Sequence, residues 1–113
     1  MNQNQIRQGD VLLVRVAKAS IETEAPRENG KIILAHGEVT GHAHAIIEKR
    51  ARRSPERTEQ ANSAPLLVSD LEIKAAMVEL CHEEHATAKV GNGNYRVIRQ
   101  REYFPEAIRT VAD

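Results

Sequence analysis

Apolar residues in this chain gather in short runs that are rich in β-branched side chains. The first run covers residues 11–16 and follows a Gly9-Asp10 pair, and the second covers residues 31–36 and follows an Asn-Gly pair. Short apolar runs next to turn-forming pairs are typical of buried strands. Within them, residues 11–14 and 32–35 are apolar on both faces, which a small domain covers with difficulty. We therefore predict two buried strands and a subunit interface along one of them.

A third predicted strand carries histidines in alternation. Gly37 and Gly41 favour a bend or a hairpin before it, and His42 and His44 then stand two residues apart. Successive side chains of a strand point to opposite faces, so these two histidines share one face. Glu48 lies four residues beyond His44 and shares the same face.

Residues 49–64 differ in character from the segments on either side. They contain almost no large apolar side chain, and Pro55 and Pro65 lie within or next to them. Such a segment cannot bury enough apolar surface to offset the entropy cost of ordering it. We predict a flexible internal loop within a single domain of residues 1–113, because each flanking segment is too small for a core of its own.

Residues 69–81 allow two interpretations. Residues 69–72, Ser-Asp-Leu-Glu, match a capping box, and a helix that follows would turn Ile73, Met77 and Leu80 inward. Alternatively, residues 76–81 alternate as they do in a strand. We favour the strand, because most of the remaining sequence has the character of strands.

The last third of the chain continues the strand pattern. Residues 86–90 alternate, residues 91–94 (Gly-Asn-Gly-Asn) predict a tight turn, and residues 95–103 form a further strand before a tail or helical turn over 104–113. The predicted fold class is therefore mainly β. We expect a single small antiparallel barrel or sandwich of about six to eight short strands.

Composition narrows the class of protein. Aromatic residues make up 3% of the 113 residues, so the core must be built from Val, Ile, Leu, Ala and Met, with Tyr95 and Tyr103 as anchors. Sixteen basic and sixteen acidic residues cancel, which removes any global attraction to nucleic acid or to an anionic membrane. No apolar run approaches the roughly 20 residues of a membrane span, and the start of the sequence lacks a signal-peptide core. We expect a cytoplasmic protein that does not bind membranes.

The single cysteine, Cys81, excludes an intrachain disulfide and a zinc site with several cysteines. Its neighbour His82 would face the opposite side of a strand, so the two side chains do not form a nucleophile and base. We expect Cys81 to be a small buried side chain.

The histidines supply the clearest chemical signal. The pair His42-x-His44 can converge on one metal ion from one face of a strand, and Glu48 can add a carboxylate ligand. Imidazole nitrogen suits zinc, iron and nickel, so we expect a divalent metal of this group. The ordinary alternative is a pair of solvated histidines on a strand.

A second histidine pair, His82 and His85, depends on the local structure. In a helix, residues three apart share a face and can chelate one ion. In a regular strand they point to opposite faces, and both become ligands only if the chain turns at Glu83-Glu84. The alternative is a polar, pH-sensitive turn.

The spacing Gly37-x4-His42-x-His44-x3-Glu48 resembles the first metal motif of the cupins, small β-barrels that hold a metal ion in the mouth of a jelly roll. The resemblance covers residues 37–48 and implies that His42, His44 and Glu48 are ligands. The leading glycine spacing is one residue shorter than in cupins, and no Pro-x-Gly turn precedes a second ligand histidine. The blocks Gly-Glu-Val-Thr-Gly-His-Ala-His and His-Glu-Glu-His are also similar to those of an uncharacterised family of small bacterial proteins.

Five basic residues of the predicted loop suggest contact with phosphate groups: Lys49, Arg50, Arg52, Arg53 and Arg57. No aromatic side chains interleave with them, as recognition of single strands would require. A solvated, charged loop is the simpler interpretation.

Three hypotheses of function follow. The first is a small binding or self-assembling protein, expected to be a homo-oligomer, in which His42, His44, His82 and His85 form a metal site or a structural polar site, with no catalysis of its own. The second is a cupin-like metal-dependent enzyme, for which no feature identifies the small-molecule substrate. The third is a nucleic-acid accessory protein that uses the basic loop. We favour them in that order.

Overall fold

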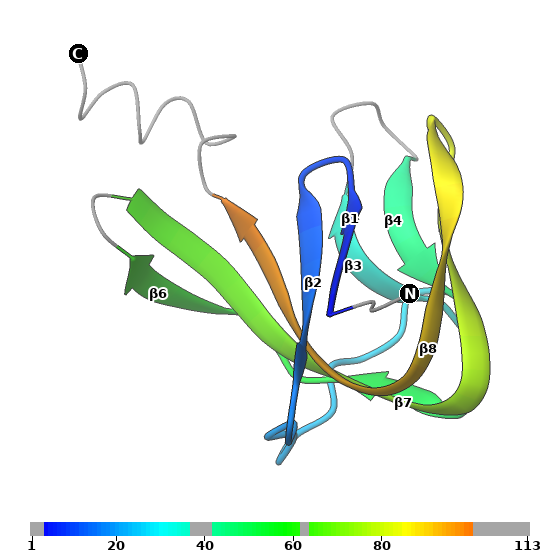
Figure 1. Cartoon of the computed structure of the whole chain (residues 1–113), viewed down its shortest axis with the longest axis horizontal. Coiled ribbons are helices and arrows are strands. Elements are labelled where there is room, and N and C mark those ends of the chain that lie inside the picture. Colours follow the sequence, from blue (N-terminus) through cyan, green and yellow to red (C-terminus); the bar gives the residue numbers. More distant parts are fainter. Residues whose placement is uncertain (1–3, 37–41, 62–63, 101–113) are drawn as a thin grey trace.

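A computed structural model describes residues 4–36, 42–61 and 64–100 of the chain, and these form one antiparallel sheet of eight strands (Figure 1). The strands are β1 (Gln5–Gln8), β2 (Val11–Val16), β3 (Ile32–His36), β4 (Ala43–Ile46), β5 (Ala51–Arg53), β6 (Arg57–Ala61), β7 (Ala64–His82) and β8 (His85–Gln100). The predicted fold class, mainly β and antiparallel, is confirmed. The sheet order β1-β2-β8-β7-β4-β3 ends on β1 and on β3, so the sheet is not a closed barrel.

The β7–β8 hairpin is the longest feature of the fold, with strands of 19 and 16 residues. Both strands curve strongly, which gives the sheet a concave inner face (Figure 1). Leu71, Ile73 and Ala75 are buried, and the burial then changes to Val78 and Leu80. A register shift between Ile73 and Met77 causes this change from odd to even positions. The strand interpretation of residues 69–81 is confirmed, and the shift explains why neither simple period persists along them.

The tight turn predicted at residues 91–94 is wrong. The strand β8 runs through this segment, and Gly93 and Gly91 pair with Ile73 and Met77, on the two sides of the register shift. Gly93 has φ of +146°, a conformation that glycine adopts without the clash of a Cβ atom. The glycines therefore let β8 bend along with β7, and the chain does not reverse there.

The flexible loop predicted over residues 49–64 is also wrong, because half of this segment forms two strands. The strand β5 pairs with β7 from Ala51↔Ile73 to Arg53↔Leu71, and β6 pairs with it from Arg57↔Val68 to Ala61↔Ala64. Both strands gain backbone hydrogen bonds to β7 while most of their side chains stay exposed. Because this stabilisation lies in the backbone, it leaves no hydrophobic pattern in the sequence.

The core is aliphatic apart from Tyr95, which is fully buried, as predicted. Methionine does not contribute in the described part of the chain, since Met77 is 53% exposed. The predictions for Tyr103 and for residues 104–113 lie outside the described residues, as does the bend at Gly37 and Gly41. The main core cluster consists of Val11, Leu13, Ile32, Leu34, Ala35, Ile46, Ala51, Leu71, Ile73, Ala75, Val78, Leu80, Val90, Tyr95 and Val97.

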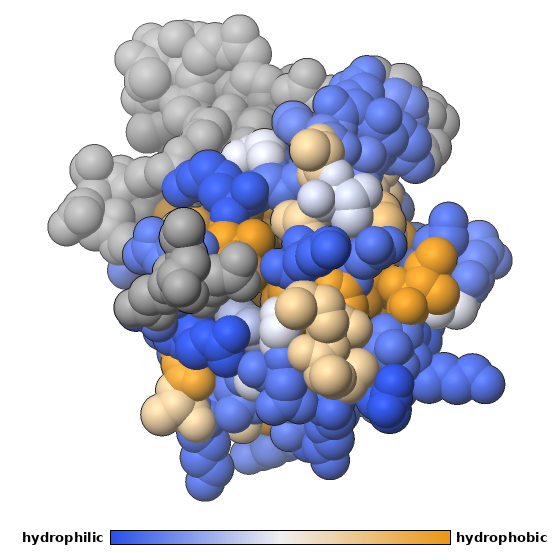
Figure 2. Space-filling view, turned by 45° about the vertical axis from the view of Figure 1, so that its right-hand side comes forward, coloured by the Kyte–Doolittle hydropathy of each residue, from blue (hydrophilic) through white to orange (hydrophobic). Residues whose placement is uncertain are grey.

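The surface view in Figure 2 is mostly hydrophilic, with apolar side chains in small separate areas. The large apolar side chains that are most exposed belong to Ile47, at 70%, and Met77. Among the described residues, no helix is long and apolar enough to cross a membrane.

Candidate metal centre

Three elements that are distant in the sequence meet at one end of the sheet. The first is the β1–β2 turn, where Gln8 pairs with Val11 around Gly9 and Asp10. The second is β4, which carries His44. The third is the β7–β8 hairpin, in which His82 pairs with His85 around the two-residue turn Glu83-Glu84. The chain thus turns at Glu83-Glu84, which the sequence analysis requires if both histidines are to be ligands.

His44, His82 and His85 form the group, with one ligand nitrogen of each lying within 4.8 Å of the others. The ring centroids of His44 and His82 are 4.3 Å apart, and those of His82 and His85 are 4.6 Å apart. His44 is buried, His82 is half-buried and His85 is exposed. The group is close enough to hold one metal ion at the edge of the core.

The protonation of His44 is set by Gln8, a buried side chain. The amide nitrogen of Gln8 donates to the backbone carbonyls of Leu80 (2.8 Å) and Ala86 (2.9 Å), so its oxygen must be the atom that faces His44. Nδ1 of His44 lies 2.7 Å from that oxygen and must therefore carry a proton. In the neutral ring, this leaves a lone pair on Nε2, which is the atom that a metal would bind.

Nε2 of His44 faces a carboxylate, since Oδ1 of Asp10 lies 3.3 Å from it. Burial lowers the pKa of His44, the imidazoles of His82 and His85 lower it further, and the Asp10 carboxylate opposes them. The neutral ring is therefore favoured near neutral pH, and a neutral imidazole is the form that binds metals.

His82 is held differently in the metal-free arrangement. The backbone N–H of Glu84 donates to Nδ1 of His82 over 2.9 Å. The neutral His82 ring therefore carries its proton on Nε2. A metal on Nδ1 would displace this hydrogen bond, and a metal on Nε2 would move the proton to Nδ1. Either way, binding through His82 requires the Glu84 hydrogen bond to break.

His42 lies beside this group. Its ring is 5.9 Å from that of His82 and nearly perpendicular to it, so His42 and His44 both contact His82. Among the described residues, Nδ1 of His42 is buried without a hydrogen-bond partner, and Oε2 of Glu84 lies 3.6 Å from it.

The structure does not bring Glu48 into the group. Its Oε2 accepts hydrogen bonds from the backbone N–H of Arg50 (3.1 Å) and from Nε of the same residue (3.3 Å). The backbone hydrogen bond lowers the pKa of Glu48. The strand β4 ends at Ile46, so the alternation that would align Glu48 with His44 stops before reaching it.

Gly9 lies close to the imidazoles of His85 and His44. It has φ of +59°, and a Cβ atom added there would lie 2.8 Å from Nε2 of His85 and 3.3 Å from Cε1 of His44. Only a residue without a side chain lets the β1–β2 turn approach the imidazoles this closely.

Most of the predicted nucleic-acid-binding residues form ion pairs or backbone hydrogen bonds. Arg52 bonds to Glu72 over 2.6 Å, Arg57 bonds to Glu59 over 3.0 Å, and Arg50 bonds to Glu48. The guanidinium of Arg53 is partly buried and donates to the backbone carbonyls of Ile33 and Ser54.

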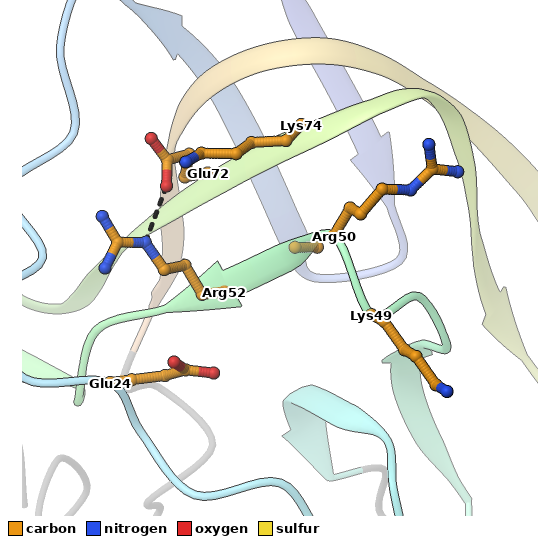
Figure 3. Close-up of a pocket in the computed structure, with 7 residues that line it drawn as sticks. Glu24, Lys49, Arg50, Arg52, Glu72 and Lys74 are labelled. Atoms are coloured by element: carbon orange, nitrogen blue, oxygen red, sulfur yellow. Dashed lines mark hydrogen bonds and ion pairs between the residues drawn. The ribbon is translucent and has the colours of Figure 1, made fainter.

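Lys49, Arg50 and Arg52 also line an open pocket of about 330 Å³ with Lys74, Glu24 and Glu72. In Figure 3, Arg52 reaches toward Glu72, whereas Lys49 and Arg50 point away from this pair and from each other. The charged groups do not converge on one point, as the binding of a phosphate would require.

Cys81 and His36 do not belong to the three-histidine group. Cys81 is exposed, so its predicted burial is wrong. The adjacent Leu80 points into the core, and alternation along β7 turns Cys81 outward. The remaining histidine, His36, is exposed on β3, and its Nε2 lies 3.4 Å from Glu28.

Sequence reasoning missed Gln8 and Asp10. Both flank Gly9, but only Asp10 was interpreted as part of the turn before a strand, and Gln8 was given no role. A polar pair at a tight turn is common in any hairpin, so no local signal connects it to histidines more than 30 residues away.

No curated protein and no solved structure matches the chain. One family model matches residues 7–100, which include all four histidines of the predicted site. The match lends no support to the cupin resemblance, and it is compatible with the expected membership of an uncharacterised family. The chain belongs to the family described as a domain of unknown function, DUF8820.

Proposed function

We propose that this protein binds a divalent transition-metal ion of the zinc class at His44, His82 and His85, and that it acts as a binding protein without catalysis of its own. The observation that carries the proposal is the convergence of three imidazoles on one point from two separate parts of the chain. Three imidazole nitrogens are a ligand set that zinc, nickel and iron accept.

Two details of the surroundings support a metal site over a chance cluster. The hydrogen bond from His44 to Gln8 fixes the ring with Nε2 free, which is the supporting contact typical of a metal-bound histidine. Three imidazoles packed together also repel one another once protonated, whereas a cation bound by the neutral rings would hold them in place.

The metal content of the purified protein tests the proposal. Protein prepared without chelator should contain about one zinc, iron or nickel ion per chain, or should take one up on incubation. The double variant His82→Ala/His85→Ala should lose it, because both residues are accessible and their removal leaves the core intact. His36→Ala is the matched control, since it removes an exposed imidazole outside the group, and it should bind like the wild type.

Thermal unfolding supplies a second measurement. An ion that binds only the folded state raises the melting temperature as its concentration exceeds the dissociation constant. Zinc should stabilise the wild type and His36→Ala but not the double variant. If none of the three metals binds to the wild-type protein, the proposal is wrong.

Homo-oligomerisation stays a prediction. Of the two strands proposed as interfaces, β2 lies between β1 and β8, whereas β3 ends the sheet order and offers an edge. We therefore place any sheet-to-sheet contact at β3. Sedimentation equilibrium of the wild type and of Ile33→Lys tests this, with an oligomer expected only for the wild type.

A further inference from the structure

The carboxylate of Asp10 lies beside one member of the three-histidine group, His44. It belongs to the turn of the β1–β2 hairpin and is not part of either histidine pair. Its Oδ1 lies 3.3 Å from Nε2 of His44, and its side chain is 38% exposed.

When the His44 ring is neutral, its Nε2 and Oδ1 of Asp10 are both hydrogen-bond acceptors. Gln8 requires the proton of His44 to be on Nδ1, so Nε2 presents a lone pair toward the Asp10 carboxylate. Two lone pairs at this distance repel unless a cation lies between or beside them. The cation could be a proton or a metal ion.

The separation fits a metal ion. Two ligand atoms that each lie about 2.0–2.1 Å from zinc at a tetrahedral angle are about 3.3 Å apart. The observed distance between Nε2 of His44 and Oδ1 of Asp10 is 3.3 Å, so this pair already has the spacing of two neighbouring ligands. The three histidine nitrogens, within 4.8 Å of one another, would need to move closer, and the Asp10 carboxylate would need to approach those of His82 and His85.

We propose that Asp10 is the fourth protein ligand, completing a closed His3Asp site with His44, His82 and His85. This inference rests on the proposed function and adds a ligand and a role to it. A site with four protein ligands has no position left for substrate, so its metal is structural. It would tie the β1–β2 turn to β4 and to the tip of the β7–β8 hairpin.

The close approach of Gly9 supports this arrangement. The turn lies against His85 and His44 with no side chain between, and the carboxylate of the next residue, Asp10, contacts His44. A turn that merely linked two strands would have no need to approach the imidazoles so closely.

Asp10→Asn tests the inference, because the amide keeps the shape of the carboxylate but is a much poorer ligand. Zinc affinity, measured by competition with a chromophoric chelator, should fall by at least about 10- to 100-fold, the loss typical even of residues that only support a ligand. Cobalt(II) should give the intense visible absorption of a tetrahedral site in the wild type, and a weaker, shifted spectrum in Asp10→Asn.

The control is Glu28→Gln, which also neutralises an exposed carboxylate next to Nε2 of a histidine, here His36, outside the group. It should leave zinc affinity and the cobalt spectrum unchanged. If Asp10→Asn binds zinc and cobalt like the wild type, the carboxylate serves only as a counter-ion of His44 and the inference is overturned, while the proposed function stands. If the wild type binds no metal, the proposed function itself fails.

Discussion

The side-chain oxygen of Gln8 accepts a hydrogen bond of 2.7 Å from Nδ1 of His44, across 36 residues of sequence. The same amide donates to two backbone carbonyls of the β7–β8 hairpin, those of Leu80 and Ala86. One buried side chain therefore joins the first strand to β4 and to both strands of the long hairpin. It also determines which nitrogen of His44 is free.

Replacing Gln8 should affect both stability and metal binding. Gln8→Leu keeps the approximate volume but leaves two carbonyls and an imidazole N–H without partners. We expect the free energy of unfolding to fall by about 2–4 kcal/mol in urea titrations of the metal-free protein. We also expect zinc affinity to fall by about 10- to 100-fold, because His44 loses its supporting contact.

The control for this variant is Gln5→Leu, on the same strand but exposed. It should change stability by no more than about 0.5 kcal/mol and leave zinc affinity unaltered. Equal zinc affinity in Gln8→Leu and the wild type would show that the Gln8 contact does not prepare His44 for a metal.

Gly9→Ala should weaken metal binding through a steric effect alone. The added Cβ atom would meet Nε2 of His85 at 2.8 Å, a distance that forces the turn or the ring to move. Gly30→Ala is a matched control, because Gly30 also has a positive φ, of +79°, but has open space around its Cα atom. Both variants should lose about 1–2 kcal/mol of stability from the backbone conformation. Only Gly9→Ala should also lose zinc affinity in calorimetric titrations, and an equal loss in both variants would contradict this explanation.

Metal binding should release the backbone N–H of Glu84. This group donates to Nδ1 of His82 in the metal-free protein, and coordination through either nitrogen of that ring is incompatible with the hydrogen bond. In nitrogen–proton correlation spectra, the Glu84 amide proton should move to lower chemical shift as zinc is added. His82→Ala should place this signal at lower chemical shift before zinc is added, and zinc should then have little effect on it. An unchanged Glu84 signal in wild-type protein that has bound zinc would exclude His82 as a ligand.

Tyr95 should ionise at a higher pH than an ordinary tyrosine. Burial raises its pKa, whereas the guanidinium of Arg15, which donates to its hydroxyl over 2.6 Å, acts in the opposite direction. In the unfolded chain the phenol titrates near pH 10, so the free energy of unfolding should decline as the pH rises above that value. Below it, both states keep the proton and Tyr95 contributes no pH dependence.

The ultraviolet absorbance of the phenolate measures this directly. Tyr103→Phe leaves Tyr95 as the single tyrosine of the chain. Its titration midpoint should lie above 10, and it should rise further in Arg15→Met, which removes the opposing charge. A midpoint at or below the ordinary value would show that Tyr95 is not buried as the structure has it.

Local patterns in the sequence were enough to predict the strand class and the histidines of the candidate site. β-branched runs at 11–16 and 31–36 and the alternation around His44 are local patterns, and each corresponds to a strand. From the spacing of His82 and His85, the sequence also predicts that both can be ligands only if the chain turns at Glu83-Glu84. The β7–β8 hairpin has this turn. These predictions succeed because side-chain alternation along one strand depends only on neighbouring residues.

Tertiary structure alone decided which groups meet. The pairing of β5 and β6 with β7, the register shift near Ile73 and the continuous path of β8 all follow from backbone hydrogen bonding and curvature, which leave little trace in side-chain pattern. The alignment of separate strands across the sheet places Gln8 and Asp10 next to His44. The same alignment leaves Glu48 in contact with Arg50 and not with the histidines. That alignment minimises the free energy of the whole fold, so no segment contains the information that places these residues around His44.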